Sequence, residues 1–182
     1  MKLIGISGLA RSGKDSFYEL SKPILKRAKR DCVKFAFADQ LKNECDEILS
    51  KYTNISAFTE DPEEKRMIRS LLVTYGTHIR RKLNPQCWIE KIEKEVKKNL
   101  SSNKVVFITD VRFENEIDWV HELGGSTVHV SKEGNSAPNQ DELKNNPILI
   151  KKSKHFIHWD SFNKEDMRKI SNNVTKVLSS IL

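Results

Sequence analysis

The chain has 182 residues, of which 37% are hydrophobic and 31% are charged. This length can bury a substantial core and most simply forms one domain. No apolar stretch has membrane-spanning length and the N-terminus lacks a signal-peptide pattern, which argues against a membrane protein and predicts a cytoplasmic one.

The net charge and the cysteine spacing limit the kinds of ligand that the protein is expected to bind. A formal net charge of +7 fits either a nucleic-acid surface or an enzyme that holds several phosphates. The chain has no arginine-rich tail and no basic stretch interleaved with aromatics, which favours the second interpretation. Its three cysteines, Cys32, Cys45 and Cys87, lack metal-site spacing and are expected to be reduced thiols.

The first apolar run, Leu3-Ile4-Gly5-Ile6, predicts a short buried strand that leads into Gly8-Leu9-Ala10-Arg11-Ser12-Gly13-Lys14. Strand, glycine loop and lysine at a helix start form the P-loop pattern, G-x-x-x-x-G-K. Backbone N–H groups of such a loop point at a phosphate, and Lys14 can reach the β- and γ-phosphates. A Ser or Thr that binds Mg²⁺ usually follows the lysine. Here Asp15 and Ser16 follow it, and the sequence does not choose between them.

The next hundred residues predict one more short strand and several helices. Apolar periodicity places the strand at 33–37 and the helices at 16–30, 38–49, 63–83 and 88–100. Residues 52–62 are expected to form a loop, and Asn84-Pro85 to end the third helix. Asp39 is either the N-cap of the second helix or a ligand-binding group at the carboxyl end of a strand.

The rest of the chain predicts strands at 104–109 and 126–130, an edge strand near 156–157, and helices at 111–123 and 162–182. Alternating strands and helices indicate an α/β fold, the three-layer P-loop NTPase fold, with a mostly parallel, roughly five-stranded sheet covered by helices. We expect a single domain over 1–182. A helical part over about 43–100 is expected to bind the acceptor of a phosphoryl group, and a lid or mobile segment is expected over about 132–154.

Phosphoryl transfer needs Mg²⁺, cationic groups on the phosphates and a pocket for the acceptor. Asp110 ends a strand and either holds Mg²⁺ or caps the next helix. Arg112 and Glu116, four residues apart, form either an ion pair or a grip on the acceptor. Trp88 is a candidate for stacking on a base, or else a core residue. Four arginines flank Gly76-Thr77 and are candidates for the acceptor phosphate, namely Arg66, Arg69, Arg80 and Arg81.

Together these stretches resemble the phage-type deoxynucleoside monophosphate kinases, which are P-loop enzymes of the nucleoside-monophosphate-kinase fold. The resemblance covers most of residues 1–131, and the Gly13-Lys14-Asp15-Ser16 segment matches the G-K-D-[ST] variant of that family. The matched stretches are Ser7 to Ser16, Phe37 to Lys42, Arg69 to Trp88, and Thr109 to Glu116 with Leu123-Gly124-Gly125.

The P-loop and the resemblance together imply transfer of the γ-phosphoryl group of ATP to a deoxynucleoside monophosphate, with Mg²⁺ bound by Asp15, Ser16 or Asp110. Lys14, Arg112 and Asp110 would carry the catalysis. The residues expected to bind ATP are Gly8, Arg11, Ser12, Gly13, Lys14, Asp15 and Ser16. The residues expected to bind the monophosphate are Asp39, Arg69, Gly76, Trp88, Arg112 and Glu116.

Two alternatives stay open. One is another small-molecule P-loop kinase, similar to dephospho-coenzyme A kinase, and the other is a nucleic-acid-binding ATPase. Besides the substrate, a second copy of the chain in a homodimer is considered as a partner, while membranes and stably bound nucleic acid are not expected.

Overall fold

A computed structural model describes residues 2–137, 139–160 and 167–182 of the chain. The chain divides into two compact units. The first, here called the sheet unit, comprises Met1–Phe35 and Glu95–Leu182. The second, the helical unit, comprises Ala36–Lys94 and overlaps the acceptor-binding part expected at about 43–100. Among the described residues, no helix is both long and apolar enough to cross a membrane.

The sheet unit contains five strands in the order β2-β3-β1-β4-β5, and every pair of neighbours is parallel. The strands are β1 (Lys2–Ser7), β2 (Cys32–Phe35), β3 (Val105–Val111), β4 (Ser126–Lys132) and β5 (His155–Trp159). The predicted five-stranded α/β sheet is therefore confirmed, and β5 forms the expected edge strand. Because all strands run the same way, their carboxyl ends and the loops that follow them lie at one edge of the sheet.

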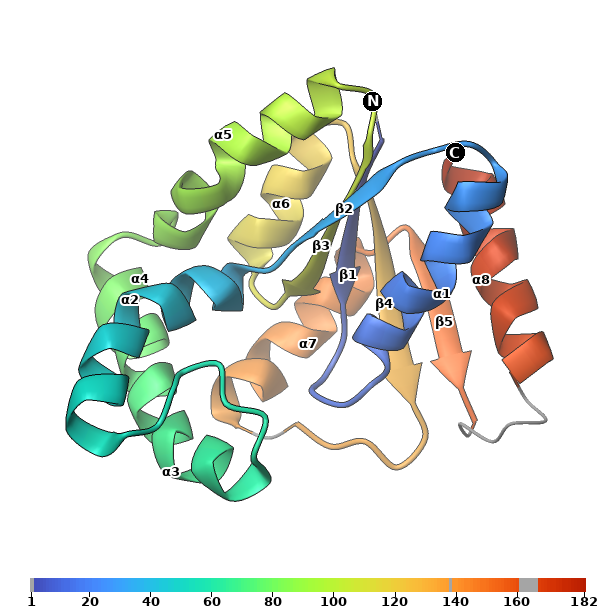
Figure 1. Cartoon of the computed structure of the whole chain (residues 1–182). Coiled ribbons are helices and arrows are strands. Elements are labelled where there is room, and N and C mark those ends of the chain that lie inside the picture. Colours follow the sequence, from blue (N-terminus) through green and yellow to red (C-terminus); the bar gives the residue numbers. More distant parts are fainter. Residues whose placement is uncertain (1, 138, 161–166) are drawn as a thin grey trace. The chain divides into compact units, whose positions relative to one another are not determined.

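Helices cover both faces of this sheet (Figure 1). They are α1 (Lys14–Arg27) and α8 (Met167–Ile181) on one face, and α6 (Glu114–Glu122) and α7 (Gln140–Lys152) on the other. Alternation along β1 explains the two faces, because successive side chains of a strand point in opposite directions. Ile4 and Ile6 pack toward α1 and α8, whereas a Cβ at Gly5 would lie 3.1 Å from Val120 of α6. Gly5 thus gives α6 room to lie close to the sheet.

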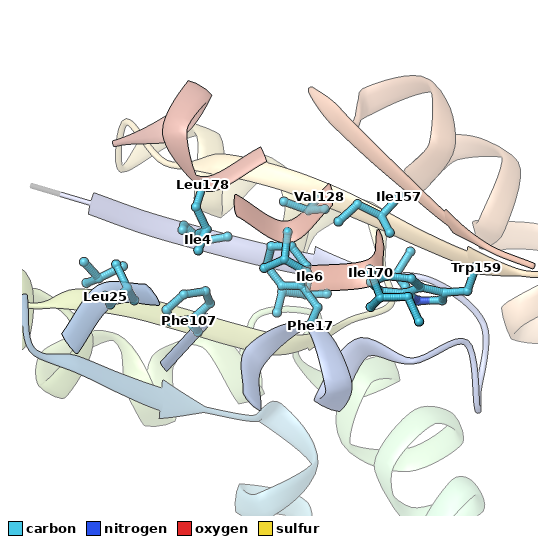
Figure 2. Packing of buried hydrophobic residues seen from close by; sticks show 13 residues of the cluster. Ile4, Ile6, Phe17, Leu25, Phe107, Val128, Ile157, Trp159, Ile170 and Leu178 are labelled. Carbon is cyan, nitrogen blue, oxygen red and sulfur yellow. The ribbon is translucent and has the colours of Figure 1, made fainter. Parts of the chain in front are cut away.

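The core between the sheet and the α1–α8 pair is built from apolar side chains of four strands and both helices (Figure 2). Removing each such side chain from water contributes roughly 1.5–3 kcal/mol, so this cluster is a major source of the unit's stability. Its buried members are Ile4, Ile6, Phe17, Leu25, Val105, Phe107, Val128, Val130, Ile157, Trp159, Ile170, Val174 and Leu178.

The helical unit has its own smaller core, made by Cys45, Leu49, Ile55, Ala57 and Ile68. Its elements are α2 (Phe37–Thr53), α3 (Pro62–Val73), the π-helix η1 (Thr74–Arg80), α4 (Arg81–Leu83) and the first part of α5 (Cys87–Ser101). The sequence predicted one continuous helix over 63–83, but a π-helical segment interrupts it. π-Helical turns are rare and often occur at functional sites.

Two predicted element boundaries were wrong, one at the start of a helix and one at the end of a strand. Helix α2 begins at Phe37 and its N-cap is Ala36, so Asp39 lies within the first turn and does not cap the helix. Strand β3 continues through Asp110 to Val111, so Asp110 lies inside the strand and not after it. The start of the predicted last helix, 162–166, lies outside the described residues, and α8 accounts for the rest of it.

Helix α7 was not predicted, because its sequence is polar and contains Pro147, which lacks an N–H for the helical ladder. The N-terminus of the helix is nevertheless capped. The side chain of Asn139 caps it by accepting a hydrogen bond from the backbone N–H of Glu142 at 2.8 Å. Part of the segment expected to form a lid or a mobile stretch at 132–154 is therefore a regular helix.

Candidate active site

The loop between β1 and α1 has the backbone geometry that a P-loop needs. Gly8, Arg11 and Gly13 have φ values of 136°, 62° and 93°, and Gly13 is the N-cap of α1. A Cβ at Gly8 would lie 2.1 Å from the carbonyl oxygen of Val130, so only glycine fits there. Left-handed residues in such a turn direct successive N–H groups toward one concavity, which suits an anion.

One buried side chain in this loop supports that interpretation. Ser12 is 1% exposed, and within the described part of the chain its hydroxyl has no hydrogen-bond partner. Burying an unpartnered hydroxyl costs free energy, and a phosphate oxygen at the loop would provide a partner. The residues present therefore fit the phosphates of a nucleotide.

Lys14 lies in the first turn of α1, buried against the loop. Its ammonium donates hydrogen bonds to the carbonyl oxygens of Gly8 and Leu9, both at 2.7 Å. Burial first and the Arg112 charge second lower the pKa of Lys14, nearby carboxylates led by Glu142 oppose them, and the net result is a pKa of about 8. Lys14 thus remains mostly protonated near pH 7, and a bound phosphate would favour the charged form further.

The three predicted metal ligands lie in different environments. Asp15 is 82% exposed and its carboxylate is 3.4 Å from the ammonium of Lys34. Ser16 is half-buried, and Asp110 is buried in β3. Within the described ranges, no group of three or more His, Cys, Asp and Glu side chains could hold a metal ion alone. A Mg²⁺ ion at this loop would accordingly take several of its oxygen ligands from phosphates and water.

Glu116 performs a task that its spacing from Arg112 did not predict. Helix α6 begins at Glu114, so Arg112 precedes the helix and the expected shared helical face is wrong. The Glu116 carboxylate is fully buried and accepts hydrogen bonds from the backbone N–H groups of Arg112 at 2.7 Å and Phe113 at 3.0 Å. Glu116 thereby fixes the turn that carries Arg112. Its predicted contact with an acceptor stays a prediction.

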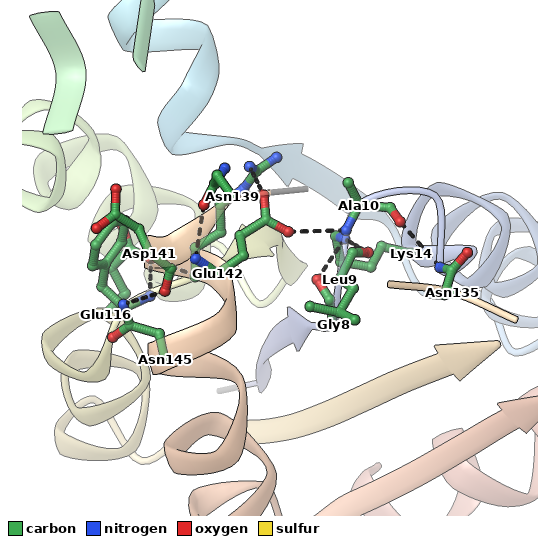
Figure 3. Close-up of polar contacts among 12 residues, drawn as sticks. Gly8, Leu9, Ala10, Lys14, Glu116, Asn135, Asn139, Asp141, Glu142 and Asn145 are labelled. Carbon is green, nitrogen blue, oxygen red and sulfur yellow. Dashed lines mark hydrogen bonds and ion pairs between the residues drawn. The ribbon is translucent and has the colours of Figure 1, made fainter. Parts of the chain in front are cut away.

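The Arg112 side chain contacts a residue that the sequence did not single out. Its guanidinium Nη1 donates to Oε1 of Glu142 at 2.9 Å, and Oε2 of the same carboxylate accepts from the backbone N–H of Ala10 at 3.0 Å (Figure 3). No pattern in the sequence predicted this contact, since only the folded chain brings Glu142 to the P-loop. Lys14, Arg112 and Glu142 therefore form one cluster in the sheet unit.

A buried polar network lies at the end of β1. The hydroxyl of Ser7 is 3.0 Å from Nδ1 of His129 and 3.3 Å from the hydroxyl of Ser153. Burial lowers the pKa of His129 to about 4, and the charge of Lys14 acts in the same direction. Ser7 is fully buried, so this serine–histidine pair supports the fold and is not placed as a nucleophile.

The predicted site residues of the helical unit differ in how accessible they are. Arg69 is exposed and, among the described residues, makes no hydrogen bond or ion pair. Asp39 is half-buried. Gly76 is buried in η1, where a Cβ would lie 2.8 Å from the side chain of Leu41. Trp88 is 2% exposed. The roles predicted for these four residues in acceptor binding stay predictions.

A partly buried carboxylate, that of Glu44, connects several side chains of the helical unit. Glu44 accepts hydrogen bonds from the hydroxyl of Tyr75 at 2.9 Å and from two nitrogens of Arg80 at 3.0 Å, and it lies 3.0 Å from the ammonium of Lys91. Burial would raise the pKa of Glu44, but these hydrogen bonds lower it overall. The Arg80 guanidinium also lies 5.5 Å from the centroid of the Trp88 ring. The sequence did not indicate this cluster.

Comparisons with known proteins agree with this geometry. A family model described as phosphomevalonate kinase matches residues 6–126, which is more than half of the chain. A search of the curated proteins returns no match.

Two solved structures resemble the whole chain. Dephospho-CoA kinase from Campylobacter jejuni is 16% identical with a TM-score of 0.54, over 100% of this chain and 98% of that one. The protein TT1252 from Thermus thermophilus is 15% identical with a TM-score of 0.52, over 99% of this chain and 97% of that one. At such identities these likenesses show the fold alone, which is that of P-loop kinases.

The low pKa of His129 makes stability depend on pH. The unfolded chain protonates this histidine near pH 6.5, whereas the folded protein resists protonation until about pH 4. Stability contributed by neutral His129 is thus present above pH 6.5 and is lost as the pH falls toward 4, by roughly 3 kcal/mol. We expect His129→Gln to flatten this part of the profile, measured by urea unfolding between pH 7.5 and 4. His158→Gln, at an exposed position, is the control. Equal pH profiles for wild type and His129→Gln would contradict the assignment.

Proposed function

The chain belongs to the phosphomevalonate kinase family, and we propose that it transfers the γ-phosphoryl group of ATP to a small molecule that already carries a phosphate. The observation that carries this proposal is the P-loop itself, with Lys14 at its helix start and the Arg112 guanidinium held by the same carboxylate that contacts the loop. During transfer, negative charge is spread over the three equatorial oxygens of the phosphoryl group, and the two cations can stabilise that charge.

The proposed mechanism needs no protein nucleophile. An oxygen of the acceptor phosphate attacks the γ-phosphorus of ATP in line, the bond from that phosphorus to the β–γ bridging oxygen breaks, and ADP leaves. The chain's task is therefore to position both substrates and to offset negative charge. The P-loop backbone and Lys14 would hold the phosphates of ATP, and Arg112 would bind acceptor oxygens through its planar donors. Asp15, Ser16 or Asp110 would hold Mg²⁺, which would further neutralise the charge of the phosphates.

Two acceptor classes have specific support. The stretches shared with phage-type kinases, above all Gly13-Lys14-Asp15-Ser16 and Thr109 to Glu116, favour a deoxynucleoside monophosphate. The family match favours another small-molecule acceptor, such as phosphomevalonate, and the fold is shared with a dephospho-CoA kinase. The comparisons support this second class better than the first, so the assay must include both.

An acceptor panel tests the proposal directly. ADP release from ATP and Mg²⁺ would be measured with deoxynucleoside and ribonucleoside monophosphates, phosphomevalonate, dephospho-CoA, and single- and double-stranded DNA. We expect one class of small acceptor to raise ADP release at least about tenfold above hydrolysis by water, and Lys14→Ala to abolish this increase. ATP consumption that depends on DNA and on none of the small acceptors would instead indicate a nucleic-acid-dependent ATPase.

Replacing Arg112 with Lys tests the acceptor side of the site. Lysine keeps the charge but loses the planar fork that binds phosphate oxygens. A charge-assisted hydrogen bond contributes about 1.5–3 kcal/mol, so kcat/KM for the acceptor should fall about ten- to a hundredfold. The dissociation constant for ATP, measured by calorimetry without acceptor, should hardly change. Weaker ATP binding with unaltered acceptor kinetics would place Arg112 on the ATP side.

Asp15→Ala tests which side chain serves Mg²⁺. The exposed pair with Lys34 contributes at most about 1 kcal/mol, so it does not prevent Asp15 from turning toward a metal ion. We expect the Mg²⁺ concentration at half-maximal activity to rise several-fold, with a smaller change in the acceptor KM. Lys34→Ala, which removes only the partner, is the control. An unaltered Mg²⁺ titration in Asp15→Ala would assign the role to Ser16 or Asp110.

A further inference from the structure

The peptide group of Ala10, at the outer arc of the P-loop, is held on both sides by one segment that follows β4. Its N–H donates to Oε2 of Glu142 at 3.0 Å, and its carbonyl oxygen accepts from the side-chain amide of Asn135 at 3.0 Å (Figure 3). Both contacts join residues more than 120 positions apart in the chain. The loop conformation around Ala10 therefore depends on Asn135 and Glu142 as well as on the loop's own glycines.

The Glu142 carboxylate divides its two oxygens between two different donors. Oε2 serves the P-loop and Oε1 serves the Arg112 guanidinium, so one side chain connects the loop to the turn before α6. The Glu142 side chain is 9% exposed in this pair, whereas that of Arg112 is 40% exposed. The carboxylate is thus the fixed partner, and Arg112 retains surface with which to contact a substrate.

Glu142 is itself held in place. It lies in the first turn of α7, where its backbone N–H donates to the capping side chain of Asn139. Its charge also raises the pKa of Lys14, against the effect of burial and of Arg112. A buried carboxylate that neutralises two nearby cations stabilises an arrangement in which like charges would otherwise repel each other.

We propose that Glu142 is a positioning residue for phosphoryl transfer, which acts by aiming Arg112 from a carboxylate that the Ala10 N–H holds in place. Glu142 uses only one of the five N–H donors of the Arg112 guanidinium, so it would orient the planar group and leave other donors for an acceptor. This inference rests on the proposed function, because Arg112 has a substrate to orient toward only if the chain is a phosphotransferase.

The same contacts would allow a competing role. If the Glu142 carboxylate competed with a phosphate for the Ala10 N–H, removing its charge would tighten nucleotide binding. Positioning predicts something different: nucleotide binding changes little, while turnover falls because Arg112 is no longer held. Measuring both the dissociation constant for the nucleotide and kcat therefore distinguishes the two roles.

The test is a double-mutant cycle with Glu142→Gln, Arg112→Lys and the double variant. Glutamine keeps the size of the side chain but can accept from only one of the two donors. Asp141→Asn makes the same charge change one residue away and is the control. Steady-state kinetics with the acceptor found in the panel give kcat and both KM values, calorimetry gives the ADP dissociation constant, and thermal unfolding shows that each variant is folded.

We expect Glu142→Gln to lower kcat at least about tenfold, with the KM for ATP and the ADP dissociation constant changed by less than about threefold. Because Glu142 acts through Arg112, the double variant should lose little more activity than Arg112→Lys alone. Asp141→Asn should behave as wild type.

Tighter ADP binding in Glu142→Gln, fully additive losses in the double variant, or an equal loss in Asp141→Asn would overturn the inference while leaving the kinase proposal intact. Failure of the proposed function is seen separately, as a wild-type protein without acceptor-dependent turnover, and this inference would then fail with it.

Discussion

The close approach of the P-loop to strand β4 is the constraint on which the site depends. The first glycine of the loop, Gly8, lies so near Val130 that any Cβ would overlap its carbonyl oxygen. This contact needs β1 and β4 to be neighbours, and their parallel pairing provides that. From there the chain turns through left-handed residues into α1, which brings the Lys14 ammonium back onto the loop carbonyls. Sheet order, loop geometry and lysine position are therefore parts of one arrangement.

Two buried carboxylates extend this arrangement to the turn after β3. Glu116 holds the backbone of Arg112, and Glu142 holds its guanidinium. Burying a carboxylate is costly unless hydrogen bonds and opposite charges compensate it. Both carboxylates are compensated here by groups of the candidate site itself, namely backbone N–H groups and Arg112. Their burial thus has a local purpose: it restricts the arginine that we propose for the acceptor from both its main chain and its side chain.

The sequence predicted the features that depend on local pattern and missed those that depend on distant partners. Apolar runs and the glycine spacing were sufficient for the parallel sheet, its edge strand and the P-loop. Periodicity could not show the π-helical segment η1, and the polar residues around Pro147 concealed α7. The functions of Glu142 and Glu44 could not be seen at all, because each acidic side chain meets its donors only in the folded chain, across 30 or more residues. Exposed and buried glutamates look alike in a sequence.

In the helical unit, too, a carboxylate holds an arginine, but here the arginine lies against an aromatic ring. Glu44 holds Arg80 by two hydrogen bonds, and the guanidinium of Arg80 lies over the ring of Trp88. A base could stack on that ring face only if Arg80 moved away, which would break both hydrogen bonds to the partly buried Glu44 carboxylate. Trp88 is therefore better placed to support Arg80 than to bind a base directly. Arg69, exposed and without a polar partner among the described residues, would lose no existing contact on binding an acceptor phosphate. The predicted role of Arg69 in acceptor binding stays a prediction, and it is the role in this unit that requires no existing polar contact to break.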